Sequence, residues 1–320
     1  MKKNYIPVII FILVLSLRAA GADPGTSAGD FLRITPGATG PALGNAVVSM
    51  DQTAEALFHN PAGLSTLDRT EFALSYSRWM NDLNFMSLAF GSKTEETGNV
   101  GLGFTGLFYG DIPVVSLDES GQLTQTARMA GAYDFAVMAA IADQTAKTFS
   151  MGITAKLIFH SLDDERSTEL AIDAGTGLHV RSAQALIGPR TGNLTFGLAL
   201  QNIGSKARFD SEEFDLPLQL KLGAHYSLLN LEQGIHMATI YLDAVKSVTE
   251  GVKINSGLEY GFRQIIYLRA GVKAGNDLDT YSLGAGLNVP LKSSFLKLDY
   301  AYVPYGSLAV SHQISLRFTL

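Results

Sequence analysis

Six histidines are the side chains of this sequence best suited to acid, base or metal chemistry, and the chain contains no cysteine. None of the six lies in an HExxH pattern, in a pair with metal-ligand spacing or beside a GxSxG elbow, the arrangements that hydrolases and metalloenzymes use. His160, followed by Asp163 and Asp164, comes closest to a site, but an acidic surface loop is the expected structure there. The sequence therefore predicts a protein that is not an enzyme and holds no metal or cofactor.

Gly101, Gly103 and Gly106 spell GxGxxG, the pattern of a phosphate-binding turn. That turn follows a strand and opens a helix, whereas these glycines lie inside a candidate strand, so nucleotide binding is not expected. A net charge of -6 without a Lys/Arg-rich run argues against a nucleic-acid partner, because binding phosphates requires clustered basic side chains. The lack of cysteine also excludes a disulfide framework and a thiolate zinc site.

The first 22 residues predict a cleaved signal peptide. Lys2 and Lys3 precede the apolar run 6–17, and the small residues 20–22 offer a cleavage site before Asp23. The run is too short to span a bilayer comfortably as a helix, and a stop-transfer anchor is the alternative. Cleavage would leave 21 basic and 30 acidic side chains, so the mature chain is expected to be exported and acidic.

Beyond residue 67 the sequence alternates with the period of a strand. In the stretch 149–160, the apolar face consists of Phe149, Met151, Ile153, Ala155, Leu157 and Phe159. The opposite face is polar or small and consists of Ser150, Gly152, Thr154, Lys156 and His160. The strands of a soluble β-sandwich also alternate between apolar and polar residues. These strands, however, reach the length at which a tilted strand crosses a bilayer, and their polar face suits the lumen of a barrel. The predicted fold is all-β: a transmembrane antiparallel β-barrel.

About fourteen strands are expected, an even number, as in bacterial outer-membrane barrels. They are placed near 70–78, 84–91, 98–108, 131–142, 148–160, 169–181, 193–202, 219–229, 235–245, 252–262, 265–274, 280–289, 295–304 and 310–320. The long gaps 110–130 and 203–217 follow the third and seventh strands, where such barrels carry external loops, and the turn 263–264 follows the tenth. Aromatic residues at external strand ends predict an interfacial girdle: Tyr76, Trp79, Phe108, Tyr109, Tyr300, Tyr302 and Tyr305.

The last strand carries Phe318 and Leu320 on its apolar face, and its pairing with the first strand would leave no free edge. Outer-membrane lipid is the expected surrounding of the barrel, and the barrel-assembly machinery is the expected partner of this C-terminal strand. The expected location is the outer membrane of a diderm bacterium.

Residues 23–67 do not alternate, and they are expected to form a plug in the barrel, which occupies 68–320. Asp51 is the expected cap of a short helix that runs to Phe58 and stops at Asn60-Pro61. The alternative is a loose periplasmic tail, but the apolar content of the segment favours the plug.

Several blocks in this order resemble the PorV/PorQ family, which is related to FadL-type long-chain fatty-acid transporters. The blocks are 28–32, Gly37-Ala38, Gly44, 51–64, 110–113, 201–204, 298–306 and 311–316. The resemblance covers essentially the whole mature chain and implies a FadL-like barrel with an N-terminal plug. It also implies one of two roles, uptake of hydrophobic small molecules such as fatty acids or service in type IX protein secretion; a purely structural barrel is a third possibility.

The preferred expectation is an uptake channel. Apolar residues of an external loop would collect the substrate: Ile112, Val114, Val115 and Leu117. Cations of the polar face would orient a carboxylate head: Lys156, Arg181, Lys221, Arg269 and Lys273. The alternative for these cations is a structural ladder with Asp134, Asp173 and Glu259.

The Asn60, Pro61, Ala62 and Gly63 motif is expected to shape a plug turn that moves to open the path; a static helix stop is the alternative. A gap in the barrel wall is the expected exit for the substrate.

Overall fold

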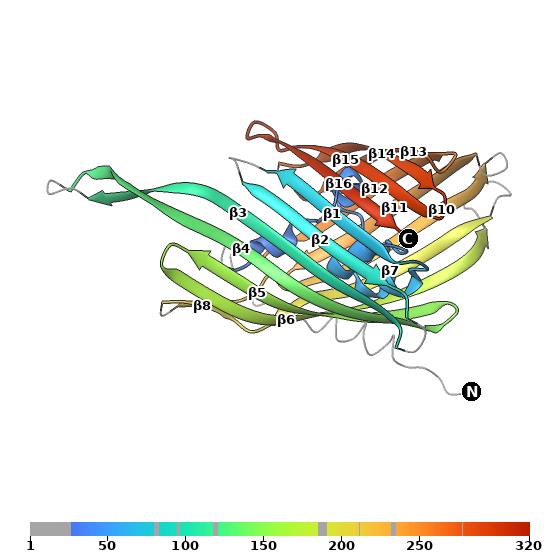
Figure 1. Cartoon of the computed structure of the whole chain (residues 1–320), viewed down its shortest axis with the longest axis horizontal. Coiled ribbons are helices and arrows are strands. Elements are labelled where there is room, and N and C mark those ends of the chain that lie inside the picture. Colours follow the sequence, from blue (N-terminus) through green and yellow to red (C-terminus); the bar gives the residue numbers. More distant parts are fainter. Residues whose placement is uncertain are drawn as a thin grey trace.

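The computed structural model describes residues 27–79, 83–94, 97–117, 121–184, 191–210, 212–231, 235–276 and 278–320. Within these ranges fourteen strands form one closed antiparallel barrel, in which β1 pairs with β16 (Figure 1). The barrel strands are β1 (Glu71–Arg78), β2 (Asn84–Ser92), β3 (Asn99–Leu117), β4 (Leu123–Ala146), β5 (Phe149–Leu162), β6 (Glu165–Gln184), β7 (Thr191–Gly204), β10 (Gln219–Leu231), β11 (His236–Ser247), β12 (Val252–Phe262), β13 (Ile266–Ala274), β14 (Tyr281–Leu291), β15 (Ser294–Pro304) and β16 (Val310–Thr319). The predicted fold class is confirmed.

The expected long connectors are partly regular structure. Most of the stretch 110–130 continues β3 and β4 into a two-stranded hairpin that projects far beyond the barrel (Figure 1). β-branched residues such as Ile112 and Val115 extend the ladder there, so most of the expected external loop is a paired hairpin and the two strands were predicted too short. The other connector contains a small separate hairpin of β8 (Ala207–Phe209) and β9 (Glu212–Phe214).

The two ends of the barrel differ. We call the end from which β3 and β4 project the hairpin end. At the opposite end, the terminal end, the Leu320 N–H donates to the Thr70 carbonyl across the β1–β16 seam, at 2.9 Å. Most links at the terminal end are short; Arg263 and Gln264, for example, form a tight turn in which both have positive φ values, 52° and 56°.

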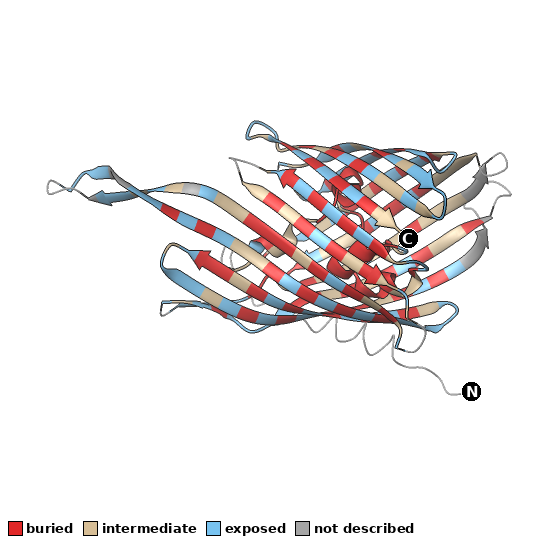
Figure 2. Ribbon diagram, viewed as in Figure 1, coloured by how far each residue is buried: buried red, intermediate tan, exposed pale blue. Residues whose placement is uncertain are grey.

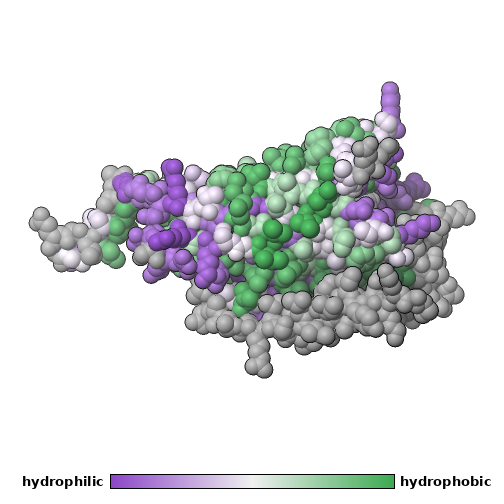
Figure 3. All heavy atoms as spheres, turned by 90° about the horizontal axis from the view of Figure 1, so that it is seen from below, coloured by the Kyte–Doolittle hydropathy of each residue, from purple (hydrophilic) through white to green (hydrophobic). Residues whose placement is uncertain are grey.

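The barrel reverses the burial pattern of a soluble protein. Outward side chains are large and apolar, and Leu102, Leu170 and Val272 are 58%, 67% and 58% exposed. Inward positions are buried and often polar, so burial alternates along each strand (Figure 2). The apolar side chains gather in a central band with hydrophilic residues on both sides (Figure 3), the surface of a barrel embedded in lipid.

Only part of the predicted aromatic girdle faces outward. Tyr76 and Tyr300 lie on the outer surface, 46% and 38% exposed. Tyr109 instead donates a hydrogen bond to Asp134 Oδ2, at 2.6 Å. Trp79 and Tyr305 bond to each other at 2.8 Å and line a cavity inside the hairpin end.

Residues 27–67, here called the interior segment, lie inside the barrel. They contain η1 (Asp30–Arg33), α2 (Thr39–Ala42), η2 (Ala54–Phe58) and η3 (Pro61–Thr66). α2 contacts β13 to β15, η2 contacts β1 to β3, and η3 contacts β3 to β6, so the segment spans the lumen. It begins at the hairpin end, where the Ala28 N–H donates to the Asp215 carbonyl, and leads into β1 at the terminal end.

The predicted cap of the short helix was wrong by two residues. Thr53, and not Asp51, is the N-cap of η2, and its side chain accepts the Glu55 N–H at 3.3 Å. Threonine is well suited to this position because its hydroxyl can satisfy a free N–H of the first turn. None of the described helices is long and apolar enough to cross a membrane.

A ring of glycines lets the interior segment approach the wall. These inward-facing glycines, the glycine girdle, each lie so close to the segment that a Cβ would contact it: Gly91, Gly101, Gly103, Gly152, Gly175, Gly197, Gly223, Gly257, Gly271 and Gly284. A glycine within a strand commonly marks such a close approach. The girdle explains why a glycine-rich sequence forms long, regular strands.

Candidate functional site

The lumen contains a cavity of about 440 Å³ at the hairpin end. It lies between the first turns of the interior segment and the inner faces of β10 to β13, β15 and β16, and Trp79 and Tyr305 belong to its lining. The charged residues of its lining are Asp30, Arg33, Lys221, Glu250, Lys253, Lys273 and Asp279. This cavity has the mixed polar and apolar lining that an amphiphilic ligand needs.

Most charges of this cavity are paired. Arg33 lies 3.2 Å from Glu250 and donates to the Ser247 hydroxyl at 2.8 Å, while Lys253 lies 2.6 Å from Glu250. Lys273 donates to Asp279. Lys221 differs, because no described residue forms a hydrogen bond or ion pair with its ammonium group. Its charge is therefore available to an anionic ligand.

A second cavity, of about 660 Å³, lies at the terminal end. Its lining is mostly polar and includes Asp51, Asn99, Asp143, His179 and Thr195. A short stretch of the interior segment, Val48–Asp51, separates the two cavities, since Val48 lines the first and Asp51 the second. We call this stretch the barrier turn.

The barrier turn is held by a few hydrogen bonds. The Val48 N–H donates to Asp243 Oδ2 at 2.9 Å, and the Asn60 side-chain NH2 donates to the Val48 carbonyl at the same distance. Ser49 Oγ lies 3.2 Å from His225 Nδ1. Ser49 and Met50, which separate the cavities, are only 3% and 9% exposed.

His179 ties the end of the barrier turn to the wall in a geometry that resembles a catalytic triad. Ser150 Oγ lies 3.1 Å from His179 Nε2, and Asp51 Oδ2 lies 3.5 Å from Nδ1. However, Ser150 is fully buried, and its position in the β5–β6 ladder provides no free N–H pair for an oxyanion. The arrangement therefore suits anchoring and not nucleophilic attack.

Asn60 organises the predicted plug motif. Its Oδ1 accepts the Ala62 N–H at 3.1 Å as the N-cap of η3, and its NH2 group donates to the carbonyls of Val48 and Thr176. Pro61 occupies the first position of η3, where its missing N–H costs nothing. Gly63 allows the Met50 carbonyl to approach, because a Cβ there would lie 2.4 Å from that oxygen.

We expect Asn60→Ala to lower the free energy of unfolding by about 1 to 3 kcal/mol, because it leaves buried polar groups without partners. Asn60→Asp should cost more, since it keeps the cap but places a carboxylate against two carbonyl oxygens. Urea unfolding in detergent, followed by heat-modifiable gel mobility, measures both. A stability of Asn60→Asp equal to that of the parent would contradict this role of the amide.

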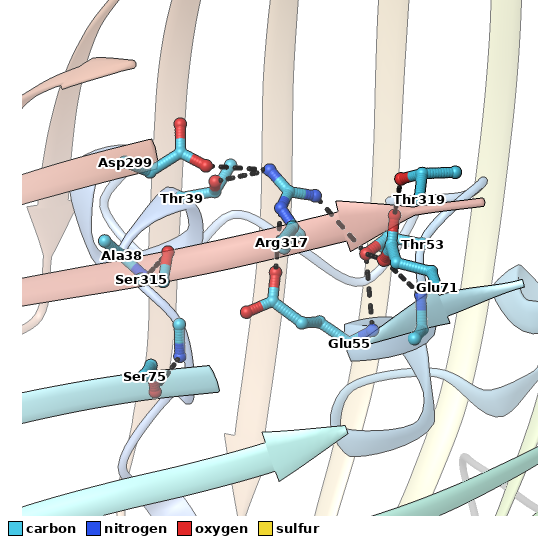
Figure 4. A network of polar contacts seen from close by, with 12 residues as sticks. Ala38, Thr39, Thr53, Glu55, Glu71, Ser75, Asp299, Ser315, Arg317 and Thr319 are labelled. Carbon is cyan, nitrogen blue, oxygen red and sulfur yellow. Dashed lines mark hydrogen bonds and ion pairs between the residues drawn. The ribbon is translucent and has the colours of Figure 1, made fainter. Parts of the chain in front are cut away.

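A buried network around Arg317 fixes the interior segment to the wall on the other side of the lumen (Figure 4). The guanidinium group donates to Asp299 and to the Thr39 hydroxyl, both at 3.0 Å, and to the Thr53 hydroxyl at 3.3 Å. Glu55 Oε2 lies 3.7 Å from Arg317 Nε. Burial raises the pKa of the Glu55 carboxyl to about 7, and the attraction of Arg317 offsets this only in part.

Glu55 should make stability depend on pH. Its folded pKa of about 7 exceeds the ordinary value of 4.5, so the folded state binds the proton more tightly. The resulting stabilisation is complete below pH 4.5 and is lost as pH rises towards 7. We expect Glu55→Gln, which mimics the protonated form, to raise the urea midpoint at pH 8 and to change it little at pH 4.5. An equal change at both pH values would contradict this assignment.

The five predicted substrate cations have different environments. Lys156 lies 2.7 Å from Asp173, and Arg269 lies 2.6 Å from Glu259, so both form the structural pairs of the alternative interpretation. Lys221 and Lys273 line the hairpin-end cavity. Arg181 is part of β6, but its side chain lies outside the described residues.

The predicted apolar collecting residues lie on the projecting part of β3. Val115 is 52% exposed, and Ile112 and Val114 are partly buried. The side chain of Leu117 lies outside the described residues. Ile112, Val114 and Val115 line neither cavity.

His160 has other partners than the sequence suggests. It contacts Asp134 Oδ1 at 2.7 Å and Glu169 Oε2 at 3.3 Å, whereas Asp163 and Asp164 both pair with Arg128. No group of three or more His, Asp or Glu side chains in the described ranges is placed to hold a metal ion.

Sequence analysis missed Asp243, His225 and Arg317, which contact the interior segment directly. Each occupies an inward position of its strand. The contacts themselves join residues far apart in sequence, and no local pattern marks them.

The fold is similar to that of solved outer-membrane proteins. The toluene transporter TbuX of Ralstonia pickettii has a TM-score of 0.55 at 13% identity, over 88% of this chain and 97% of that chain. The toluene transporter TodX of Pseudomonas putida has a TM-score of 0.52 at 13% identity, over 89% and 98%. A FadL homologue of Pseudomonas aeruginosa has a TM-score of 0.47 at 10% identity, over 89% and 98%.

At these identities the likeness shows the fold alone. No family model and no curated protein matches the sequence. Membership of the PorV/PorQ family and the relation to FadL-type proteins therefore stay predictions, while the barrel fold is shared with the two toluene transporters.

Proposed function

We propose that the chain is an outer-membrane channel for the uptake of small amphiphilic molecules with an apolar body and an anionic head, such as fatty acids. The hairpin end would face outward and the terminal end the periplasm. The observation that carries the proposal is the hairpin-end cavity with the unpaired Lys221 on its wall. Two structural neighbours named toluene transporters support a channel for apolar compounds.

In this proposal the interior segment acts as a plug. It occupies the lumen between the cavities and is tied to strands on several sides. The two cavities, of about 440 and 660 Å³, count against a barrel that serves only as a structural element, because such a barrel needs no ligand space.

Uptake of radiolabelled oleate and toluene by a deletion strain, with and without the gene restored, tests the function. We expect restoration to increase oleate uptake more than toluene uptake, because the cavity wall is charged. Equal uptake of both compounds with and without the gene would remove the proposal.

Lys221→Met should weaken oleate binding about 10- to 100-fold, since a charge-assisted hydrogen bond contributes about 1.5 to 3 kcal/mol. Lys253→Met is the matched control, because Glu250 already neutralises this lysine of the same cavity. Binding to the purified protein is measured for oleate and for its uncharged methyl ester. An equal loss for both ligands would contradict recognition of the carboxylate.

A second candidate role is the secretion function implied by the family resemblance. The projecting β3–β4 hairpin supports it, because its strands extend beyond their neighbours and leave backbone edges on which another chain could pair. Shortening this hairpin should abolish protein secretion if the second role holds, and should leave oleate binding to the purified protein intact if the first does, because the cavity lies inside the barrel.

A further inference from the structure

The barrel wall offers no lateral exit in this conformation. Every barrel strand pairs with both neighbours, and the β1–β16 seam is paired from Glu71 to Arg78. Within the described residues there is therefore no gap of the kind expected from the sequence. A molecule in the hairpin-end cavity is confined to the lumen unless strands separate.

The lumen, in contrast, is obstructed by a thin layer along its β7, β10 and β11 side. Along the interior segment, only Ser49 and Met50 lie between Val48, which lines the hairpin-end cavity, and Asp51, which lines the terminal-end cavity. Val48 packs against this wall at two girdle positions, since a Cβ on Gly197 would lie 2.3 Å from its carbonyl oxygen and one on Gly223 would lie 2.7 Å from its Cβ.

The backbone on both sides of this layer adopts left-handed conformations. Gly44 and Asn45 precede it with φ values of 66° and 62°, and Gln52 follows it with a φ of 57°. Such values are uncommon for residues other than glycine, and they occur where a chain reverses direction sharply. The barrier turn is thus bounded by two sharp changes of chain direction, at Gly44-Asn45 and at Gln52.

The anchors of the barrier turn differ from those of the remaining interior segment. Asp243, Asn60 and His225 each bind it through one hydrogen bond, and His179 lies 3.5 Å from Asp51 at its end. Near Ala54, the Thr53 hydroxyl and the Ala54 N–H both donate to Glu71, and Arg317 adds further bonds. The barrier turn can therefore move while the η2 region stays attached to the wall.

We propose that the substrate leaves through the lumen, past a displaced barrier turn Val48–Asp51, and that Asp243 and Asn60 hold this turn closed at rest. The inference rests on the proposed uptake function. Displacement would join the two cavities into one path from the hairpin end to the terminal end. The polar lining of the second cavity suits the head of an amphiphile, which enters water there.

A disulfide between the barrier turn and the wall tests the route. Val48→Cys with Gly223→Cys places two thiols at positions whose Cβ atoms lie 2.7 Å apart, less than a disulfide requires, so the turn has to shift. The new Cβ at Gly223 would also lie 2.3 Å from Asp243 Oδ1, and the reduced pair is therefore the reference that already includes any displacement of Asp243. Ala54→Cys with Gly91→Cys, at 3.0 Å, is the matched control on the η2 region. The parent has no cysteine, so no other thiol interferes.

Oleate uptake by cells is measured with each pair oxidised and then reduced. We expect the oxidised Val48/Gly223 pair to lose uptake at least tenfold and to recover it on reduction, while the oxidised control pair retains uptake. Full uptake by the oxidised Val48/Gly223 pair would overturn the lumenal route and leave the uptake function standing. Loss of uptake in both oxidised pairs would overturn the assignment of movement to the barrier turn.

If the parent protein takes up no oleate, the proposed uptake function is wrong. Ion conductance then tests separately whether the barrier turn closes the lumen. Asp243→Ala should raise conductance in planar bilayers several-fold, because it frees the Val48 N–H. Asp134→Ala, which removes a partly buried carboxylate away from the turn, is the control and should leave conductance at the parent level. Unchanged conductance in Asp243→Ala would overturn the closing role of Asp243.

Discussion

Gly175→Leu is expected to open the barrel to ions in planar bilayers. A Cβ at this position would lie 1.9 Å from Asn60 Oδ1 and 3.1 Å from Pro61 Cδ. The ladders to β5 and β7 fix the backbone of β6, so the interior segment has to move away. The cost should exceed the ~1 to 3 kcal/mol typical of an overpacked core, because Asn60 also loses its bonds.

Gly131→Leu is the matched control for this experiment. Gly131 also lies on a barrel strand, but no atom lies within 4 Å of its ideal Cβ position. We expect this variant to keep the parent's conductance and urea midpoint. A Gly175→Leu variant with both values unchanged would show that the interior segment does not close the lumen.

Arg317→Met is expected to lower the free energy of unfolding by about 3 to 5 kcal/mol, the cost of removing one partner from a buried ion network. The change leaves Glu55 without its cation and takes two guanidinium bonds from the interior segment, those to Thr39 and Thr53. Urea unfolding in detergent measures the loss. Combining the change with Glu55→Gln should recover part of it, because the uncompensated carboxylate is removed.

Lys297→Met is the control for a general effect of removing an inward cation. The Lys297 ammonium lies 4.4 Å from the centre of the Tyr267 ring, an interaction that contributes about 0.5 to 2 kcal/mol. A loss in Arg317→Met no larger than in Lys297→Met would contradict the network's role in holding the interior segment.

The strands were predictable because alternation is local. A residue such as Met151 or Leu222 has to face lipid, and its neighbours then face the lumen, so the pattern fixes both the strand and its face. The strands β3 and β4 were predicted to be shorter than they are. Beyond the apolar band both faces of a hairpin contact water, so the sequence there does not distinguish a loop from a two-stranded hairpin.

The candidate site was only partly predictable. Alternation placed Lys156, Lys221 and Arg269 inside the barrel, but it could not tell which of them is paired. That depends on contacts across strands and across the lumen, such as the one between Glu55 and Arg317. The glycine girdle is reflected in the high glycine content of the sequence. Nothing in the sequence indicated the path of the interior segment that the girdle accommodates.

The location of two anchors on the last strand has a consequence for biogenesis. Ser315 Oγ accepts the Ala38 N–H at 3.2 Å, and Arg317 binds Thr39 and Thr53, so β16 contacts the interior segment while it pairs with β1. These bonds form only when the C-terminal strand arrives, after every other strand has been synthesised. The interior segment, which is made before the barrel strands, therefore has to be enclosed before the cylinder is sealed, and ring closure and filling of the pore become one step of assembly.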